Sequence, residues 1–270
     1  MRPGKVAPLY EKIWMNEGSP LRVYSERITE SMSKHVDGIH IEHAMRYGNP
    51  SIRKGLENLR EAGVTELLLL PMFPHHAQAT TETALKHAYK EMKAMSWQPK
   101  TIEMGHFPTD ENYINPLAKS IESHLAEGTH LLYSYHGLPV SHVKRIDASK
   151  KHCQKAADCC SVSCSANELC YGRHCMETSI AVSEKLGLPA DRWSLSFQSR
   201  LGPVKWLTPS TTDKVKELVE RGVRDLAIVA PAFLADGLET LEELDMGIRE
   251  EFEEMGGERL TVIKLSLIHI

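Results

Sequence analysis

The chain has 270 residues, with 32 Lys and Arg against 36 Asp and Glu, and a net charge of −4. This mild charge, without a basic stripe, argues against a nucleic-acid partner. No apolar run approaches the ~20 residues of a membrane span, and no signal peptide is recognisable. We therefore expect a cytoplasmic protein with one large or two smaller domains.

The N-terminal half alternates helical and strand patterns. Helices are predicted over residues 6–14, 21–32, 52–62, 82–95 and 112–125. Strands are predicted over 36–45, 66–72 and 101–104. Ser51 is the expected N-cap of the third helix and Gly63 its stop. The near-continuous apolar run 66–72 is typical of a parallel strand that is covered on both faces.

The C-terminal half continues the alternation. Strands are predicted over 131–136, 193–197, 225–231 and 259–265, and helices over 212–221 and 236–245. Such alternation implies βαβ units and a parallel sheet. Residues 61–73 also resemble residues 220–233: a helix, a Gly-Val turn, a buried strand and Pro-x-Phe. We therefore predict two similar α/β domains, 1–127, which lacks its first strand, and 128–270.

His136 stands at the carboxyl end of the 131–136 strand, before a turn that Gly137 and Pro139 impose. Open α/β sheets bind ligands at that edge. A lone histidine at a strand end is more often structural. The 225–231 strand, however, leads into a carboxylate-rich helix at the same edge. A histidine and carboxylates that face one crevice indicate a site for a metal ion and for proton transfer.

Asp236, Glu239 and Glu243 fall at i, i+3 and i+7 on the predicted helix and so share one face. Such a face is usually solvated, but in a crevice it would attract a divalent cation. Other features remain open. The pair His75-His76 could bind metal, line a pocket or lie in solvent. Trp206 could pack on a flat ligand or close a hydrophobic surface.

Several motifs follow one another in the order of a known family. They are Val6–Tyr10, Gly18–Leu21, Met45–Gly48, Ser134–Pro139, Phe197–Arg200 and Phe233–Glu243. The chain resembles the ferrochelatases, which insert Fe²⁺ into a porphyrin. The resemblance implies two Rossmann-like domains, with parallel sheets flanked by helices, around a porphyrin cleft. Departures include Phe73-Pro74-His75-His76-Ala77, where members often carry Tyr-Pro-Gln-Tyr/Phe-Ser, and Gly237, where a His or Cys is common.

The resemblance also assigns roles to residues. It implies that His136 and Glu239 are the catalytic pair for metal and proton transfer. Asp236 and Glu243 would support them as further Fe²⁺ ligands. Contacts with the porphyrin are expected from Met72, Phe73, Ser134, Tyr135, Trp206 and Phe233. The family's opening strand and C-terminal segment are expected to be missing.

Six cysteines lie within a segment at about 150–175. In a protein that is not secreted, such crowding indicates metal or redox chemistry. Without a Cys-x-x-Cys pair a zinc ribbon is disfavoured, whereas four thiolates could hold a [2Fe–2S] cluster. Reduced surface thiols and a zinc site are the alternatives. Resemblance to bacterial ferrochelatases with such an insert implies the ligands Cys153, Cys159, Cys160 and Cys170, with Cys164 as the alternate.

We therefore predict a ferrochelatase that uses protoporphyrin IX or coproporphyrin III. One alternative is a cobalt or nickel chelatase for another tetrapyrrole. The other is a non-catalytic iron–sulfur or haem-binding carrier. The long insert and the run from Leu238 to Glu243 favour ferrochelatase.

Overall fold

The computed structural model describes residues 3–155 and 159–265 of the chain. In chain order the elements are α1 (Pro3–Ile13), α2 (Pro20–His35), α3 (Ile52–Glu61), β1 (Glu66–Leu69), η1 (Gln78–Glu82), α4 (Thr83–Ala94), β2 (Lys100–Glu103), α5 (Glu111–Glu122), β3 (His130–His136), α6 (Val140–Ile146), α7 (Tyr171–Lys185), β4 (Trp193–Gln198), α8 (Thr211–Glu220), β5 (Asp225–Val229), η2 (Glu239–Ile248), α9 (Arg249–Glu254) and β6 (Arg259–Val262). The labels η1 and η2 denote π-helices.

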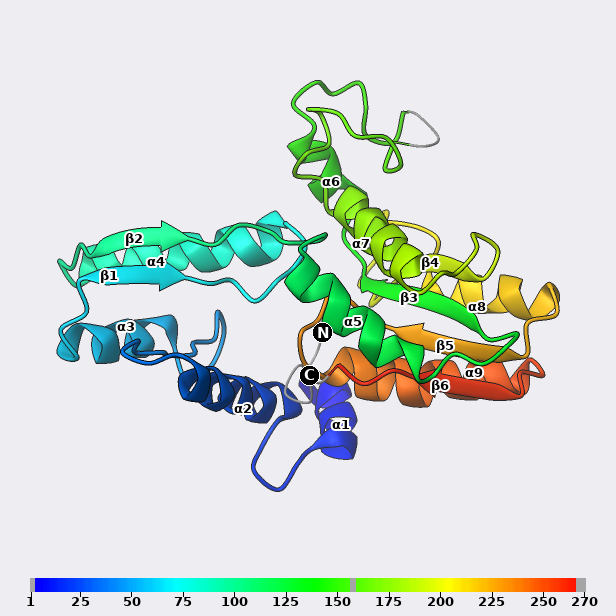
Figure 1. The fold of residues 1–270 in the computed structure, drawn as a ribbon, viewed down its shortest axis with the longest axis horizontal. Coiled ribbons are helices and arrows are strands. Elements are labelled where there is room, and N and C mark those ends of the chain that lie inside the picture. The colour runs from blue at the N-terminus through cyan, green and yellow to red at the C-terminus, as the bar shows by residue number, and fades with distance from the viewer. Residues whose placement is uncertain (1–2, 156–158, 266–270) are drawn as a thin grey trace.

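The described strands form two parallel sheets. β1 pairs with β2, and a second sheet has the order β4-β3-β5-β6. Figure 1 shows β1 and β2 with α3 and α4 at one end of the molecule, and the second sheet with α6 to α9 at the other. The predicted division at residue 127 falls between α5 and β3, but separate domains remain a prediction.

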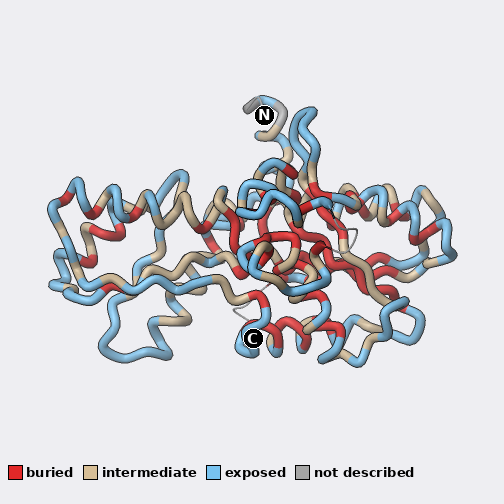
Figure 2. The backbone as a smooth tube through the Cα atoms, turned by 90° about the horizontal axis from the view of Figure 1, so that it is seen from above, coloured by how far each residue is buried: buried red, intermediate tan, exposed pale blue. Residues whose placement is uncertain are grey.

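The main core surrounds β3, whose residues are all buried except His136, which is half-buried. Buried backbone accordingly concentrates around this sheet and thins toward the β1–β2 end (Figure 2). A smaller cluster joins Leu67 of β1 to Leu59 of α3 and Met92 of α4. Both helices therefore cover the face that carries Leu67. On the opposite face Leu68 is 59% exposed, so the prediction that this strand is covered on both faces was wrong.

The predicted internal similarity recurs in the backbone. Gly63 follows the end of α3 and Gly222 that of α8, both with positive φ, at 76° and 91°. In each case the following valine donates its N–H back into the helix, Val64 to the Leu59 carbonyl and Val223 to that of Leu218. Positive φ costs glycine little, which suits it to this type of helix end. Two distant helix–strand joints are thus built alike.

The prediction of secondary structure failed in two ways. Within the described chain, residues 36–45 form no strand, although Met45 and Ser51 make an isolated bridge. Ile39 is 63% exposed, and no described strand lies beside this segment to form a ladder of backbone hydrogen bonds with it. Conversely, α7 was not predicted, and neither were the shorter α6 and α9.

Candidate functional site

The ends of β3 and β4 meet at the carboxyl edge of the larger sheet. His136 pairs in register with Gln198, and the Gly137 N–H donates to the Gln198 carbonyl at 2.8 Å. A Cβ on residue 137 would lie only 2.8 Å from that same carbonyl oxygen. Glycine therefore allows the two strand ends to approach closely, and this approach fixes the position of His136.

The His136 side chain is held in one tautomer by its own turn. Its Nδ1 lies 2.7 Å from the Gly137 carbonyl oxygen, which can only accept a hydrogen bond. Nδ1 therefore carries the proton, and Nε2 of the neutral imidazole keeps its lone pair. The ring meets Phe233 edge to face, with 6.2 Å between centroids. His136 is thus half-buried but arranged to accept a proton or to ligate a metal ion through Nε2.

The helix that carries the carboxylates is tied to the end of β4. Ser199 donates to Glu243 twice, from its backbone N–H to Oε1 at 2.7 Å and from its hydroxyl to Oε2 at 2.5 Å. Gln198 Nε2 donates to the Glu239 carbonyl at 3.1 Å. Because a π-helix places more than four residues in a turn, Glu239 and Glu243 project to similar sides of η2.

Electrostatic effects link these groups further. Burial raises the pKa of Glu243, whereas the Ser199 hydrogen bonds and the nearby His136 oppose that rise and Glu239 adds to it. His136, Glu239 and Glu243 therefore lie close enough to influence one another. Tyr10 of α1 belongs to the same surroundings, because burial and the charge of Glu239 raise its pKa. The sequence had assigned no role to Tyr10.

Asp236 does not share the helical face that was predicted for it. It precedes η2 and is buried, and its Oδ1 accepts a hydrogen bond from the Thr240 hydroxyl at 2.9 Å. Its Oδ2 accepts from the Leu265 N–H at 3.2 Å. The prediction of a common face was wrong because the helix begins later and is a π-helix. Burial raises the pKa of Asp236.

The predicted porphyrin contacts fall into two groups. Ser134 and Tyr135 are fully buried, and their hydroxyls bond within the protein, to Gln198 and Thr211 and to Ser179 respectively. Their placement favours a role in the core. The others keep exposed surface: Met72, Phe73, Trp206 and Phe233.

Phe233 and Trp206 lie at the His136 turn. The Trp206 ring would be 3.4 Å from a Cβ at position 137. Its buried Nε1 finds no hydrogen-bond partner among the described residues.

The paired histidines bind α7 and do not lie in solvent. Thr178 donates its hydroxyl to the Pro108 carbonyl at 2.6 Å, so His75 Nε2, 2.9 Å away, must be the donor to Thr178. The His76 N–H donates to His174 Nδ1 at 3.1 Å. Burial lowers the pKa of His75 to about 3, which keeps the ring neutral. Both residues dock the segment after β1 onto α7.

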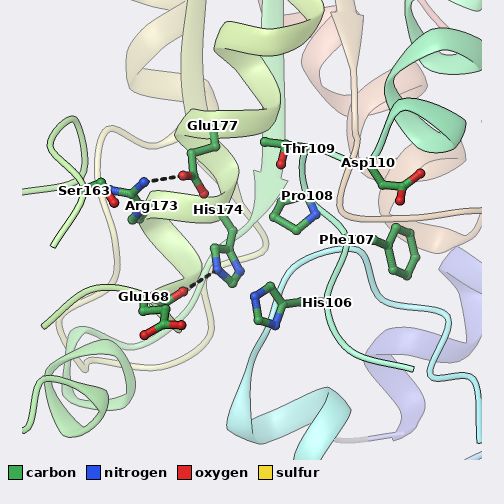
Figure 3. Close-up of a pocket in the computed structure, with 10 residues that line it drawn as sticks. All are labelled: His106, Phe107, Pro108, Thr109, Asp110, Ser163, Glu168, Arg173, His174 and Glu177. Atoms are coloured by element: carbon green, nitrogen blue, oxygen red, sulfur yellow. Dashed lines mark hydrogen bonds and ion pairs between the residues drawn. The ribbon is translucent and has the colours of Figure 1, made fainter. Parts of the chain in front are cut away.

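A cavity of about 450 Å³ lies beside this junction. In Figure 3 the His106 and His174 rings lie side by side in its lining, stacked with centroids 4.4 Å apart. His174 Nε2 donates to the Glu168 carbonyl at 2.8 Å, and Arg173 pairs with Glu177. None of the residues that line this cavity was predicted as a site residue.

Four cysteines of the insert lie near enough to influence one another's pKa. Sγ of Cys159 and Cys160 are 3.9 Å apart. A hydrogen bond from the Cys160 thiol is the main reason that the pKa of Cys170 is lowered. Burial, with Cys170 and Cys159 nearby, raises the pKa of Cys153 to about 11. These are the four cysteines that the sequence analysis had selected, and their role as ligands remains a prediction.

The insert has its own polar framework. Asp147 accepts backbone N–H bonds from Ser149, His152 and Cys153 at 3.0, 2.9 and 2.8 Å. The Asn167 amide donates to the carbonyls of Cys159 and Val162 at 2.9 and 2.7 Å. In the part of the chain that the structure describes, no group of three or more His, Cys, Asp or Glu side chains is arranged to hold a metal ion.

Solved structures with a similar fold include a sirohydrochlorin chelatase. SirB from Bacillus subtilis with Fe³⁺ matches with a TM-score of 0.59 and 12% identity over 91% of this chain and 83% of that chain. Sirohydrochlorin chelatase SirB from Bacillus subtilis subspecies spizizenii, in complex with cobalt, matches with a TM-score of 0.58 and 11% identity. This match covers 92% of our chain and 83% of that chain. The chain thus has a chelatase-type α/β fold with parallel sheets.

Sequence comparison identifies the family. The ferrochelatase family model matches residues 1–266. The ferrochelatase of Ectopseudomonas mendocina is 40% identical over 264 residues, 97% of this chain and 77% of that protein. A Pseudomonas aeruginosa ferrochelatase is 41% identical over 263 residues, with the same coverage. The chain belongs to the ferrochelatase family, the enzymes that insert iron in haem synthesis.

No helix among the described residues is long and apolar enough to cross a membrane. The predicted cytoplasmic location remains a prediction.

Proposed function

We propose that this ferrochelatase binds protoporphyrin IX or coproporphyrin III at the carboxyl edge of the larger sheet, with His136 and Glu239 as its catalytic pair. The observation that carries the proposal is the His136 tautomer. Nδ1 is committed to the Gly137 carbonyl, so the Nε2 lone pair is free, close to the carboxylates of η2. Phe233 and Trp206 beside His136 offer flat surfaces to a macrocycle.

The chemistry follows from these groups. Metallation removes two pyrrole protons and strips water from Fe²⁺. A neutral imidazole accepts a proton near neutral pH, and carboxylates hold a divalent cation and carry protons away. The porphyrin nitrogens supply most of the final ligands, so the protein needs no complete cage of its own.

The remaining predicted residues take different parts. Ser199 holds the Glu243 carboxylate with two hydrogen bonds, and Glu243 supports the pair. Asp236 has both oxygens engaged, with Thr240 and with Leu265, so we assign it to anchoring the start of η2 and not to binding Fe²⁺. Met72 and Phe73, after β1, would line the wall of the porphyrin site that lies opposite His136.

The test is anaerobic metallation. The purified protein is supplied with Fe²⁺ and protoporphyrin IX or coproporphyrin III, and the Soret shift is followed. His136→Ala and Glu239→Gln should each lower turnover by at least ~100-fold, the scale of a lost acid–base group, with the fold unchanged by circular dichroism. Exposed His124 lies after α5, and His124→Ala is the matched control. Full turnover in His136→Ala, or porphyrin binding without metallation by the wild type, would contradict the proposal.

We also propose that Cys153, Cys159, Cys160 and Cys170 hold a [2Fe–2S] cluster. The proposal is supported by the donor set, four thiols that influence one another's pKa. They lie on a loop that hydrogen bonds of Asp147 and Asn167 hold in place. Four thiolates are the usual ligands of such a cluster. Metal insertion transfers no electrons, so a bound cluster would supply a cross-link of the insert.

Anaerobically purified protein should then show charge-transfer absorbance and contain iron and sulfide in equal amounts. The Cys160→Ser variant should lose this absorbance, whereas the Cys164→Ser variant should keep it. A colourless protein with stoichiometric zinc, or bleaching by Cys164→Ser alone, would overturn this ligand set.

A further inference from the structure

We propose that Tyr171 is a positioning residue for His136, acting through the backbone carbonyl of that histidine. The inference rests on the role of His136 proposed above. Tyr171 is the first residue of α7, directly after Cys170. Its hydroxyl lies 2.8 Å from the His136 carbonyl oxygen. Because a carbonyl only accepts, the phenol must be the donor.

The end of β3 needs such a partner. β3 pairs with β4 as far as His136 and Gln198, but its pairing with β5 ends at Tyr133 and Val229. In the described chain the last three residues of β3 therefore have a neighbouring strand on one side only. A backbone carbonyl at a half-buried position costs free energy when it is left without a donor. The Tyr171 hydroxyl replaces the missing strand at this point.

The phenol is itself held in place. The Tyr171 side chain is buried, and its ring meets His75 edge to face, with 6.0 Å between centroids. The thiol of fully buried Cys175 lies beside the Tyr171 hydroxyl, and burial raises the pKa of both groups. The ring and the hydroxyl of Tyr171 are thus both surrounded by buried neighbours.

This contact governs the imidazole through two consecutive peptide groups. The His136 carbonyl accepts from Tyr171, and the next carbonyl, that of Gly137, accepts from His136 Nδ1 at 2.7 Å. If the first peptide group turns, the second turns with it, and the hydrogen bond that selects the tautomer is lost. Tyr171 therefore controls both where the ring lies and which nitrogen faces the site.

The chain offers a matched control. Tyr133 is fully buried on β3, and its hydroxyl lies 2.9 Å from Ser183 Oγ on α7. Like Tyr171, it makes one phenolic hydrogen bond between this helix and this strand. Tyr133 does not touch His136 or its turn. Tyr133→Phe and Tyr171→Phe therefore remove the same kind of bond and keep the same rings.

Tyr171→Phe should lower kcat for metallation roughly 10- to 100-fold, the scale of a small misplacement of a reacting group, with KM for the porphyrin nearly unchanged. Tyr133→Phe should keep wild-type kcat at a similar loss of thermal stability. Wild-type kcat in Tyr171→Phe, or an equal loss in both variants, would overturn the proposal.

A second readout does not depend on turnover. In ¹⁵N-histidine-labelled protein, the His136 signal, assigned with His136→Ala, should show the Nδ1–H tautomer. It should shift toward a tautomer mixture in Tyr171→Phe and stay in place in Tyr133→Phe. An unchanged His136 signal in Tyr171→Phe would refute the positioning role. Failure of the catalytic assignment would show differently, as full turnover in His136→Ala.

Discussion

Gly137 leaves no space for a side chain between the ends of β3 and β4. An added Cβ would lie 2.8 Å from the Gln198 carbonyl oxygen and 3.4 Å from the Trp206 ring. Gly137→Ala must therefore push apart the strand ends that position His136. We expect a loss of about 1–3 kcal/mol in the free energy of unfolding, as for overpacking elsewhere, and at least a tenfold loss of kcat. Urea denaturation and the metallation assay measure the two effects.

The same substitution at Gly55 is the control. Gly55 lies within α3, and a Cβ there would meet that of Ala44, in the segment before the helix, at 3.5 Å, an ordinary contact. Alanine is preferred to glycine within a helix by roughly 0.5–1 kcal/mol, so Gly55→Ala should be neutral or stabilising. Wild-type turnover in Gly137→Ala would show that the turn tolerates the displacement.

At the scale of residues, the sequence could place His136 and the carboxylates at one edge, because the ends of parallel strands meet there. The sequence could not show which of the carboxylates faces His136 and which is bonded elsewhere in the protein. Asp236 was grouped with Glu239 by α-helical spacing, but it lies before η2 and so outside the helix. Tyr171 and Ser199 were also missed, because their bonds to His136 and Glu243 join residues 35 and 44 positions apart.

At the scale of elements, Thr240 joins η2 to the loop before it. Its hydroxyl donates to the buried Asp236 carboxylate at 2.9 Å and accepts from the Gly237 N–H at 3.1 Å. Thr240→Val keeps the shape and removes both bonds. We expect it to lower the free energy of unfolding by about 1.5–3 kcal/mol, since the acceptor is a carboxylate. Urea denaturation checks this. Thr240→Ser, which keeps the hydroxyl, should cost clearly less, and equal losses in the two variants would contradict the account.

Helix α7 shows why one element escaped prediction. Its buried residues include Gly172, Thr178, Ser179 and Ser183, which carry no hydrophobic signal. Hydrophobic periodicity therefore did not reveal it, although the strands that surround it were found. The helix also joins functional parts. Its N-cap is Cys170 of the insert, and its first residue, Tyr171, reaches the end of β3.

At the scale of the whole molecule, buried histidines make the fold sensitive to acid. Burial is the main reason that the pKa of His130 and of His174 falls to about 4, and that of His75 to about 3. An unfolded histidine titrates near 6.5. Below that pH the unfolded chain binds protons that the folded chain excludes. The stability that these neutral histidines contribute is therefore fully present above pH 6.5 and falls as the pH drops toward 4.

His130 allows this to be measured at one position. It lies at the start of β3, bonded to Ser194 at 2.9 Å and far along the strand from His136. Between pH 7.5 and pH 5, its lowered pKa costs about 2 kcal/mol of stability by proton linkage. His130→Gln can still reach Ser194 but does not titrate. Its free energy of unfolding in urea should thus fall less between these two pH values than that of the wild type.

The pH window separates this effect from that of the carboxylates. The pKa of Asp225 is lowered, mainly by its hydrogen bond with Arg259. The stability that this carboxylate contributes is therefore present above the ordinary carboxyl pKa, near 4, and is lost only as the pH falls below that value. The same substitution at exposed His124 controls for the loss of a histidine. If His130→Gln and wild type lose the same stability from pH 7.5 to 5, His130 is already protonated in the folded chain. The start of β3 would then have to admit water and a charge that its burial beside Ser194 excludes.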